Sequence, residues 1–157
     1  MKLIDTNKFV DLRSILVFIS GLLTDQITKL IFSHRDFFVG PIHFHPMKNY
    51  GLSFALDFGL AANVILIVLG LIFFAYYYSA HKSTNSKLLH SAYILIFAGA
   101  VSNIADRMYF GYVRDFLDLG LGFTFNVADV FVMLGLVALL FHKDGDKFGN
   151  KQIPNNK

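Results

Sequence analysis

The chain has 157 residues, of which 55% are hydrophobic and only 16% are charged, and its formal net charge at pH 7 is +3. Soluble domains have about 25% charged residues, so this composition indicates a single membrane-embedded domain. The sequence contains no cysteine, which excludes disulfide bonds, thiolate metal sites and thiol nucleophiles and disfavours a quinone-linked thiol oxidase.

Four apolar runs are candidates for membrane-spanning helices. They cover residues 14–32, 58–80, 88–105 and 119–141. Each run approaches or exceeds the roughly 20 residues that cross about 30 Å of hydrocarbon as a helix. A soluble bundle would need a polar stripe on each helix, and the second run carries no charge. The first run is long and lacks a following small-x-small cleavage site, so we interpret it as a retained signal anchor.

The basic residues predict how these helices are oriented. Nine of the 14 lie before the first run, between the second and third runs, or after the fourth. They are Lys2, Lys8, Arg13, Lys82, Lys87, Lys143, Lys147, Lys151 and Lys157. The positive-inside rule places these segments, and with them both termini, in the cytoplasm.

Two segments are then expected on the outer side. In residues 33–57, Gly40-Pro41 and Pro46 signal turns, and residues 42–45 alternate apolar with polar as a short strand does. The aromatic residues of this segment suit a sheet at the lipid headgroups. The second outer segment, 106–118, is short and rich in tyrosine. We therefore predict an all-α integral membrane protein with four transmembrane helices and a small interfacial β-sheet between helices 1 and 2. Residues 1–143 would form this single domain, and residues 144–157 a disordered polar tail.

The acidic residues of the apolar runs gather near their outer ends. All acids in the chain are aspartates. The polar residues concerned are Asp25 and Lys29 in the first run, Asn103, Asp106 and Arg107 at the end of the third, Asp115 just outside it, and Asn126 and Asp129 in the fourth. Acids in hydrocarbon normally face a partner or a water-filled cavity. Their collection at one depth indicates a polar site in the outer leaflet.

Each of these positions also has a purely structural interpretation. Asp25 with Lys29 is then an ion pair, Asp106 with Arg107 locks a helix end, Asn49 with Gly51 forms a turn, and Asp115 is a solvated loop acid. Asp129 is harder to explain in this way, because no basic residue lies within a turn of it on its own helix. If its nearest neighbour is another acid, one of the two should hold a proton at neutral pH.

Two carboxylates that share one proton can serve as general base and general acid on a peptide bond. The segment from Asp115 to Asp129 is short enough to fold back and bring these two acids together. No Ser-x-x-Lys or serine–histidine arrangement competes in these segments. His34, His43 and His45 suggest a metal site, but without H-E-x-x-H or a comparable ligand spacing we interpret them as interfacial residues. These comparisons favour an aspartyl mechanism if the protein is a hydrolase.

At these residues the chain resembles the lipoprotein signal peptidase family (signal peptidase II). Five short motifs occur in the order typical of that family. They are Asp25-Gln26-Ile27-Thr28-Lys29, Asn49-Tyr50-Gly51-Leu52-Ser53-Phe54, residues 98–107 (AGAVSNIADR), residues 111–116 (GYVRDF) and Phe125-Asn126-Val127-Ala128-Asp129. Ser53 stands where the family usually has Ala, and Ala98 and Ser102 stand where it usually has Gly. All three residues are small, so close helix packing is expected to survive.

The resemblance implies an activity and a role for each site residue. The protein would be an aspartyl endopeptidase of the bacterial cytoplasmic (inner) membrane that removes the signal peptide from diacylglyceryl-modified prolipoproteins, cutting just before the lipidated cysteine at the outer face. Asp115 and Asp129 would be the catalytic pair, Asn49, Gly51, Asn103, Arg107 and Asn126 would bind substrate, and Asp25, Lys29 and Asp106 would support the site. The expected partners are lipid-modified precursors and membrane lipids, with no nucleic acid. The resemblance implies no metal or organic cofactor, and a monomer is expected.

Two other classes of function remain open. A proton-coupled carrier using Asp25, Asp106 and Asp129 as relays would need polar residues through the full membrane depth, and the second run offers only Asn63 and Ser79. A non-catalytic lipid-binding membrane adaptor would tolerate the loss of either acid of the pair.

Overall fold

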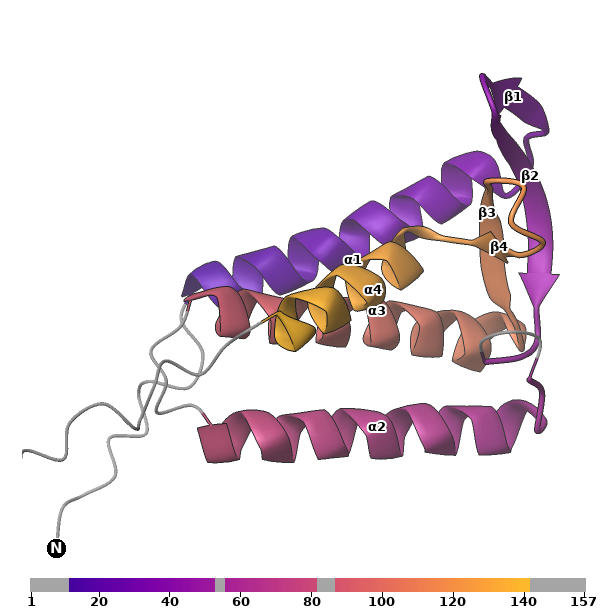
Figure 1. The fold of residues 1–157 in the computed structure, drawn as a ribbon. Coiled ribbons are helices and arrows are strands. Elements are labelled where there is room, and N and C mark those ends of the chain that lie inside the picture. The colour runs from indigo at the N-terminus through magenta and orange to yellow at the C-terminus, as the bar shows by residue number, and fades with distance from the viewer. Residues whose placement is uncertain (1–11, 53–55, 82–86, 142–157) are drawn as a thin grey trace, which may run out of the picture.

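The part of the chain that the structure describes forms four helices with a small sheet at one end. The computed structural model describes residues 12–52, 56–81 and 87–141. In chain order the elements are α1 (Leu12–Phe32), β1 (Phe37–Val39), β2 (Ile42–Asn49), α2 (Leu60–His81), α3 (Lys87–Phe110), β3 (Val113–Asp118), β4 (Thr124–Phe125) and α4 (Val127–Leu140). The sheet stands where α1 and α3 end and where α2 begins (Figure 1). The predicted tail at 144–157 lies outside the described residues.

Among the described residues, three helices are long and apolar enough to cross a membrane, namely Leu12–Phe32, Leu60–Ser79 and Leu88–Phe110. Many of their large apolar side chains face outward; Phe73 and Tyr76 of α2, for example, are 61% and 74% exposed. A surface of this kind requires lipid rather than water around it. The prediction of a helical membrane protein is therefore confirmed. The described part of α4 has 14 residues, about 21 Å at 1.5 Å per residue, which is shorter than the hydrocarbon core.

The fourth helix begins later than the hydrophobic pattern indicated. The apolar run starts at residue 119, but the helix starts at Val127, and the residues before it form a turn and β4. Gly120 and Gly122 have φ angles of 73° and 83° in this turn, a conformation that favours glycine. Asp129 consequently lies in the first turn of α4.

The sheet joins two segments that are far apart in the sequence. Its four antiparallel strands are arranged in the order β1-β2-β3-β4. The predicted strand after Gly40-Pro41 is confirmed as part of β2. The sheet is not confined to the segment between α1 and α2, however, because β3 and β4 come from between α3 and α4. The residues of β3 include three charged side chains, Arg114, Asp115 and Asp118, so the sequence did not indicate a buried strand there.

The pairing of β2 with β3 fixes which polar residues meet. Asn49 lies opposite Val113, Lys48 opposite Arg114 and Met47 opposite Asp115. A register shift separates Met47 from Phe44, and Pro46 stands within it. Proline has no N–H for the ladder and is found at such bulges. The bulge therefore sets the register that brings Asn49 to the strand carrying Asp115.

Aromatic packing holds the sheet against the end of α1. The ring of Phe32, the last residue of α1, stacks on Phe116 of β3 at a centroid distance of 5.1 Å and lies 5.0 Å from the ring of Phe44 in β2. Phe116 is 2% exposed. Such ring pairs contribute about 0.5–1.5 kcal/mol beyond the area they bury. Strand β3, which carries Asp115, is thus attached to α1 through the adjacent residue Phe116.

Helices α3 and α4 approach each other at glycines. A Cβ atom added to Gly99 would lie 2.3 Å from the backbone oxygen of Ala128, and one added to Gly135 would lie 2.7 Å from that of Ala92. Small residues allow such close contact between membrane helices. The motif residue Gly99 therefore determines how near α4, and with it Asp129, comes to α3.

Replacing Gly99 with alanine should destabilise the protein, because the new methyl group meets a backbone oxygen that cannot rotate away. We expect a cost of about 1–3 kcal/mol, typical of overpacking, measured as a lower thermal unfolding temperature in detergent micelles. Gly70→Ala is the matched control, since a Cβ there meets nothing within 4 Å. An equal unfolding temperature for both variants would contradict this account of the helix contact.

Candidate active site

A buried lysine links two helices at the end that carries the sheet. The Nζ atom of Lys29 lies 2.7 Å from the Asp25 carboxylate and 3.3 Å from the Asp106 carboxylate, and all three side chains are at most 1% exposed. Lys29 also donates a hydrogen bond of 2.9 Å to the Asn103 side-chain oxygen. The predicted pair of Asp25 with Lys29 is present, and it extends across to α3. An isolated charge at this depth would be very costly, so the group is stable only as a set.

Further polar groups surround this set. Arg114 of β3 donates to Asp106 from its backbone N–H at 3.0 Å and from Nη2 at 2.7 Å. Gln26 also donates to Asp106, at 3.0 Å. The Ser102 hydroxyl donates to Asp25 at 2.6 Å and accepts from Gln26 at 2.9 Å. Asp106 therefore pairs with Lys29 and Arg114. The helix-end interpretation, which paired Asp106 with its neighbour Arg107, is wrong.

Asp129 is positioned by a capping box at the start of α4. The Asn126 side chain accepts a hydrogen bond from the Asp129 backbone N–H at 3.0 Å, and the Asp129 carboxylate accepts from the Asn126 backbone N–H at 3.1 Å. Such reciprocal bonds satisfy helix N–H groups that have no partner within the helix. The other Asp129 oxygen accepts from the Asn103 side chain at 2.8 Å. Both oxygens are thus fixed in place by groups from two helices.

Asp115 is buried in the middle of β3, with 2% of its surface exposed. One of its oxygens accepts a hydrogen bond of 2.9 Å from the Asn49 side chain, and the other accepts one of 2.6 Å from the Asn126 side chain. The interpretation of Asp115 as a solvated loop acid is therefore wrong. Both of its partners come from predicted site positions.

Asn126 brings the two acids together. Its side-chain amide donates to Asp115, while its backbone N–H donates to Asp129. The pKa of Asp115 is raised from its ordinary 3.8 to about 7, mainly by burial and next by the nearby charge of Asp129, against the lowering effect of the bonds from Asn49 and Asn126. A carboxyl group of this kind can hold a proton at neutral pH beside an ionised neighbour.

Arg107 and the Asn49 turn complete this end of the molecule. Arg107 is 4% exposed and donates hydrogen bonds to the backbone oxygens of Gly51 and Asn103. Its Nε atom is buried and has no hydrogen-bond partner among the described residues. The Asn49 side-chain oxygen accepts from the Gly51 N–H at 3.0 Å, so the predicted turn is present, while its amide reaches Asp115. Ser53 and Phe54 of this motif lie outside the described residues.

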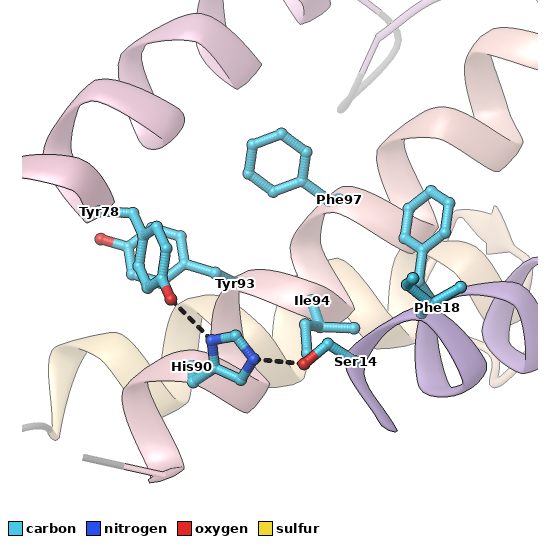
Figure 2. A pocket seen from close by; sticks show the side chains of 8 residues that line it. Ser14, Phe18, Tyr78, His90, Tyr93, Ile94 and Phe97 are labelled. Atoms are coloured by element: carbon cyan, nitrogen blue, oxygen red, sulfur yellow. Dashed lines mark hydrogen bonds between the residues drawn. The ribbon is translucent and has the colours of Figure 1, made fainter. Parts of the chain in front are cut away.

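A serine–histidine contact, which the sequence patterns did not reveal, lies elsewhere in the helices. Ser14 Oγ is 2.5 Å from His90 Nε2, and Tyr78 donates or accepts at the other ring nitrogen at 2.7 Å. These residues line an apolar cavity of about 280 Å³ between α1, α2 and α3 (Figure 2). Ser14 is near the start of α1 and Tyr78 near the end of α2, so the contact is at the end of the helices away from the sheet (Figure 1). Within the described residues the two ring nitrogens of His90 contact Ser14 and Tyr78 and no carboxylate, so the third member of a serine triad is missing there.

Three polar residues of this site had no role assigned from sequence. Arg114, Gln26 and Ser102 all contact the carboxylates of Asp25 or Asp106. Gln26 and Ser102 lie inside two of the motifs, and this was the available signal. Each contacts an acid of the other helix, which spacing along one helix does not predict. Arg114 needed the strand pairing of β3, which no local pattern predicted.

Comparisons with known proteins agree with the motifs. The family model described as signal peptidase (SPase) II matches residues 17–143. A lipoprotein signal peptidase of Microcystis aeruginosa is 40% identical over 139 residues, covering 80% of this chain and 87% of that protein. One of Psychromonas ingrahamii is 36% identical over 102 residues, covering 60% of this chain and 59% of that protein. A solved structure of a bacterial membrane enzyme superimposes with a TM-score of 0.72 at 28% identity, over 82% of this chain and 85% of that one.

Replacing Lys29 with methionine should destabilise the protein strongly, because it leaves the Asp25 and Asp106 carboxylates without their shared buried cation. Breaking a buried ion pair on one side costs about 3–5 kcal/mol, which thermal unfolding in detergent micelles would register. Lys48→Met is the matched control, since Lys48 is exposed and its cation only lies over the Tyr112 ring at 5.0 Å. Similar unfolding temperatures for the two variants would show that Lys29 does not hold the helices together.

Proposed function

The chain belongs to the signal peptidase II family, and from this premise we propose that it is an aspartyl endopeptidase that removes signal peptides from diacylglyceryl-modified prolipoproteins. The observation that carries the proposal is the pair of hydrogen bonds from Asn126, which hold the carboxylates of Asp115 and Asp129 next to each other. Two carboxylates in one site are suited to acid–base catalysis on an amide.

The charges of the site support a single proton shared by this pair. Three basic groups, Lys29, Arg107 and Arg114, are buried together with the carboxylates of Asp25, Asp106 and Asp115, and the half-buried Asp129 lies beside them. Asp25 and Asp106 are balanced by the cations they touch. The remaining Arg107 balances one negative charge, so the pair is neutralised when it carries one proton. The two acids then titrate as a unit rather than as separate groups.

The proposed reaction uses the two states of this pair in sequence. The ionised carboxylate removes a proton from a water molecule as its oxygen attacks the scissile carbonyl carbon, and the protonated carboxyl donates to the carbonyl oxygen. The tetrahedral intermediate collapses when the departing nitrogen receives the proton that the first carboxylate took from water and the C–N bond breaks. The second carboxylate takes back the proton it gave to the carbonyl oxygen as the C=O bond reforms. Each oxygen of Asp115 and Asp129 accepts one hydrogen bond from the protein and retains capacity for a second partner.

Asn49, Gly51, Asn103, Arg107 and Asn126 are proposed to hold the substrate backbone around the pair. The buried Nε atom of Arg107, without a partner in the described residues, is a donor that a substrate carbonyl would satisfy. Asp25, Lys29 and Asp106 are proposed to act indirectly, by fixing Asn103 and the start of α4. Cleavage is proposed to fall just before the lipidated cysteine.

The membrane arrangement supports the choice of substrate. We propose that both termini are cytoplasmic, that α4 acts as a fourth span, and that the sheet lies in the headgroups of the outer face of the bacterial inner membrane. An acyl-anchored cysteine would keep the scissile bond in that same layer. Confining both reactants to one plane supplies part of the positioning that catalysis requires. The enzyme is proposed to act as a monomer.

Substitution of either acid should abolish catalysis while the protein still folds. Asp115→Asn and Asp129→Asn keep the side-chain size but cannot exchange the proton, so we expect processing of a lipidated precursor to fall by at least about 10²-fold in each, within the range of general acid–base contributions. The measurement is cleavage of purified lipidated precursor in detergent, with thermal unfolding recorded for each variant.

Ser14→Ala is the matched control for this experiment. It removes the hydroxyl next to His90, so a serine mechanism would lose its nucleophile, whereas the aspartyl mechanism keeps near wild-type turnover. The unlipidated precursor tests the substrate class and should be cut slowly by the wild type. Near wild-type turnover in both Asn variants would contradict the proposed pair.

The activity should fall as the pH rises through about 7. Asp115 holds its proton in the folded protein up to a pKa of about 7, and above that pH the pair loses the proton that the acid step needs. We expect kcat/KM to decrease about tenfold per pH unit on this alkaline side, measured between pH 6 and 9. A serine–histidine mechanism gives the opposite trend, with activity rising as the imidazole loses its proton, and such a rise would exclude the shared-proton mechanism.

A further inference from the structure

A separate group of ligand-type side chains lies on the sheet. His43 and His45 of β2 and Asp118 of β3 each offer one ligand atom, and these three atoms lie within 4.8 Å of one another. Asp118 is three residues from Asp115 on the same strand. Since successive side chains of a strand alternate between its faces, residues three apart project to opposite sides. The group is therefore distinct from the pair of acids.

The Asp118 carboxylate is already oriented by the backbone. One of its oxygens accepts a hydrogen bond of 2.7 Å from the Gly120 N–H in the following turn. The other oxygen lies 3.5 Å from His45 Nε2. The strand register places Asp118 directly opposite His43. This carboxylate thus has one oxygen held by the turn and the other directed at the histidines.

The two histidine rings are also held in place. The His43 ring stacks on Phe38 at a centroid distance of 4.0 Å and lies 4.4 Å from the His45 ring. His43 Nε2 is 2.8 Å from an oxygen of Asp36. A carboxylate bonded to one imidazole nitrogen fixes the tautomer and leaves the other nitrogen as a lone-pair donor, as in many metal-binding histidines.

We propose that His43, His45 and Asp118 bind a divalent transition-metal ion, with Zn²⁺ as the best match. Two imidazoles, one carboxylate and a water molecule form a tetrahedral set that Zn²⁺ accepts. Bonds of about 2.0–2.2 Å require the three ligand atoms to close to roughly 3.3 Å from one another. The side chains are only partly buried, with 27%, 19% and 28% of their surface exposed, so they have room to rotate and an ion can reach them.

Such an ion would join β2 to β3 at the end of the strands that is next to the Gly120 turn. It would act on the sheet that carries Asp115 without contacting the catalytic pair, so its role is to stabilise or regulate. This proposal does not depend on the peptidase activity.

The test is a titration of the purified full-length protein, with any polyhistidine tag removed, with Zn²⁺ in detergent at pH 7.5. Calorimetry should show one ion bound per chain, and Zn²⁺ should raise the unfolding temperature. The double variant His45→Gln/Asp118→Asn should bind at least tenfold more weakly and show no such shift. Mg²⁺ should bind much more weakly than Zn²⁺, because it prefers an octahedral set of oxygen ligands.

His34→Gln is the matched control, because His34 is exposed and lies outside the cluster; its binding should equal that of the wild type. Equal affinity in the wild type and the double variant would overturn the proposal. Loss of binding in Asp115→Asn, with binding kept in the double variant, would place the ion at the catalytic acids and overturn it as well.

Discussion

The contact on which the site depends is that of the Lys29 ammonium with Asp25 and Asp106 inside the helices. None of these charges is stable alone in an apolar environment, so each holds the others in place. The effect reaches α4, because the second oxygen of Asp25 accepts a hydrogen bond of 2.8 Å from the Ala128 N–H in the first turn of that helix. The ion pair of Asp25 with Lys29 on α1 therefore positions both α3 and the first turn of α4, which carries Asp129.

The same contacts supply fold stability and site geometry. Asn126 caps α4, as helix stability requires, and its amide simultaneously reaches Asp115. Asn103 accepts from Lys29 and donates to Asp129. A side chain with two duties of this kind cannot move without affecting both. The acids are consequently held by a rigid network rather than by flexible loops, which is the preorganisation that charge development in a reaction needs.

Sequence patterns predicted the parts of the structure that depend on length and local spacing. The long apolar runs gave α1, α2 and α3, and Gly40-Pro41 with the following alternation gave β2. Strand β3 was missed because its Arg114 and Asp115 are unfavourable in a buried strand unless Asp106, Asn49 and Asn126 are already present as partners. The start of α4 was placed too early because the apolar run continues through the turn at Gly120 and Gly122 and through β4, whereas the helix is capped only at Asn126.

The departures from the usual family motifs show which substitutions this network tolerates. Ser102, where the family usually has glycine, is fully buried. Its hydroxyl nevertheless donates a hydrogen bond to Asp25 and accepts one from Gln26. A buried hydroxyl without partners would be costly, and one with two partners adds to the network. Ala98, in another usual glycine position, instead meets the surface of Gly21, where an added Cβ would lie 3.3 Å from the Ala98 Cβ. Gly21 on α1 thus leaves room for the methyl group of Ala98 on α3. Gly99 faces the backbone oxygen of Ala128, and no smaller neighbour could make room for a side chain there. The position of each small residue relative to the neighbouring backbone therefore decides whether it can be replaced.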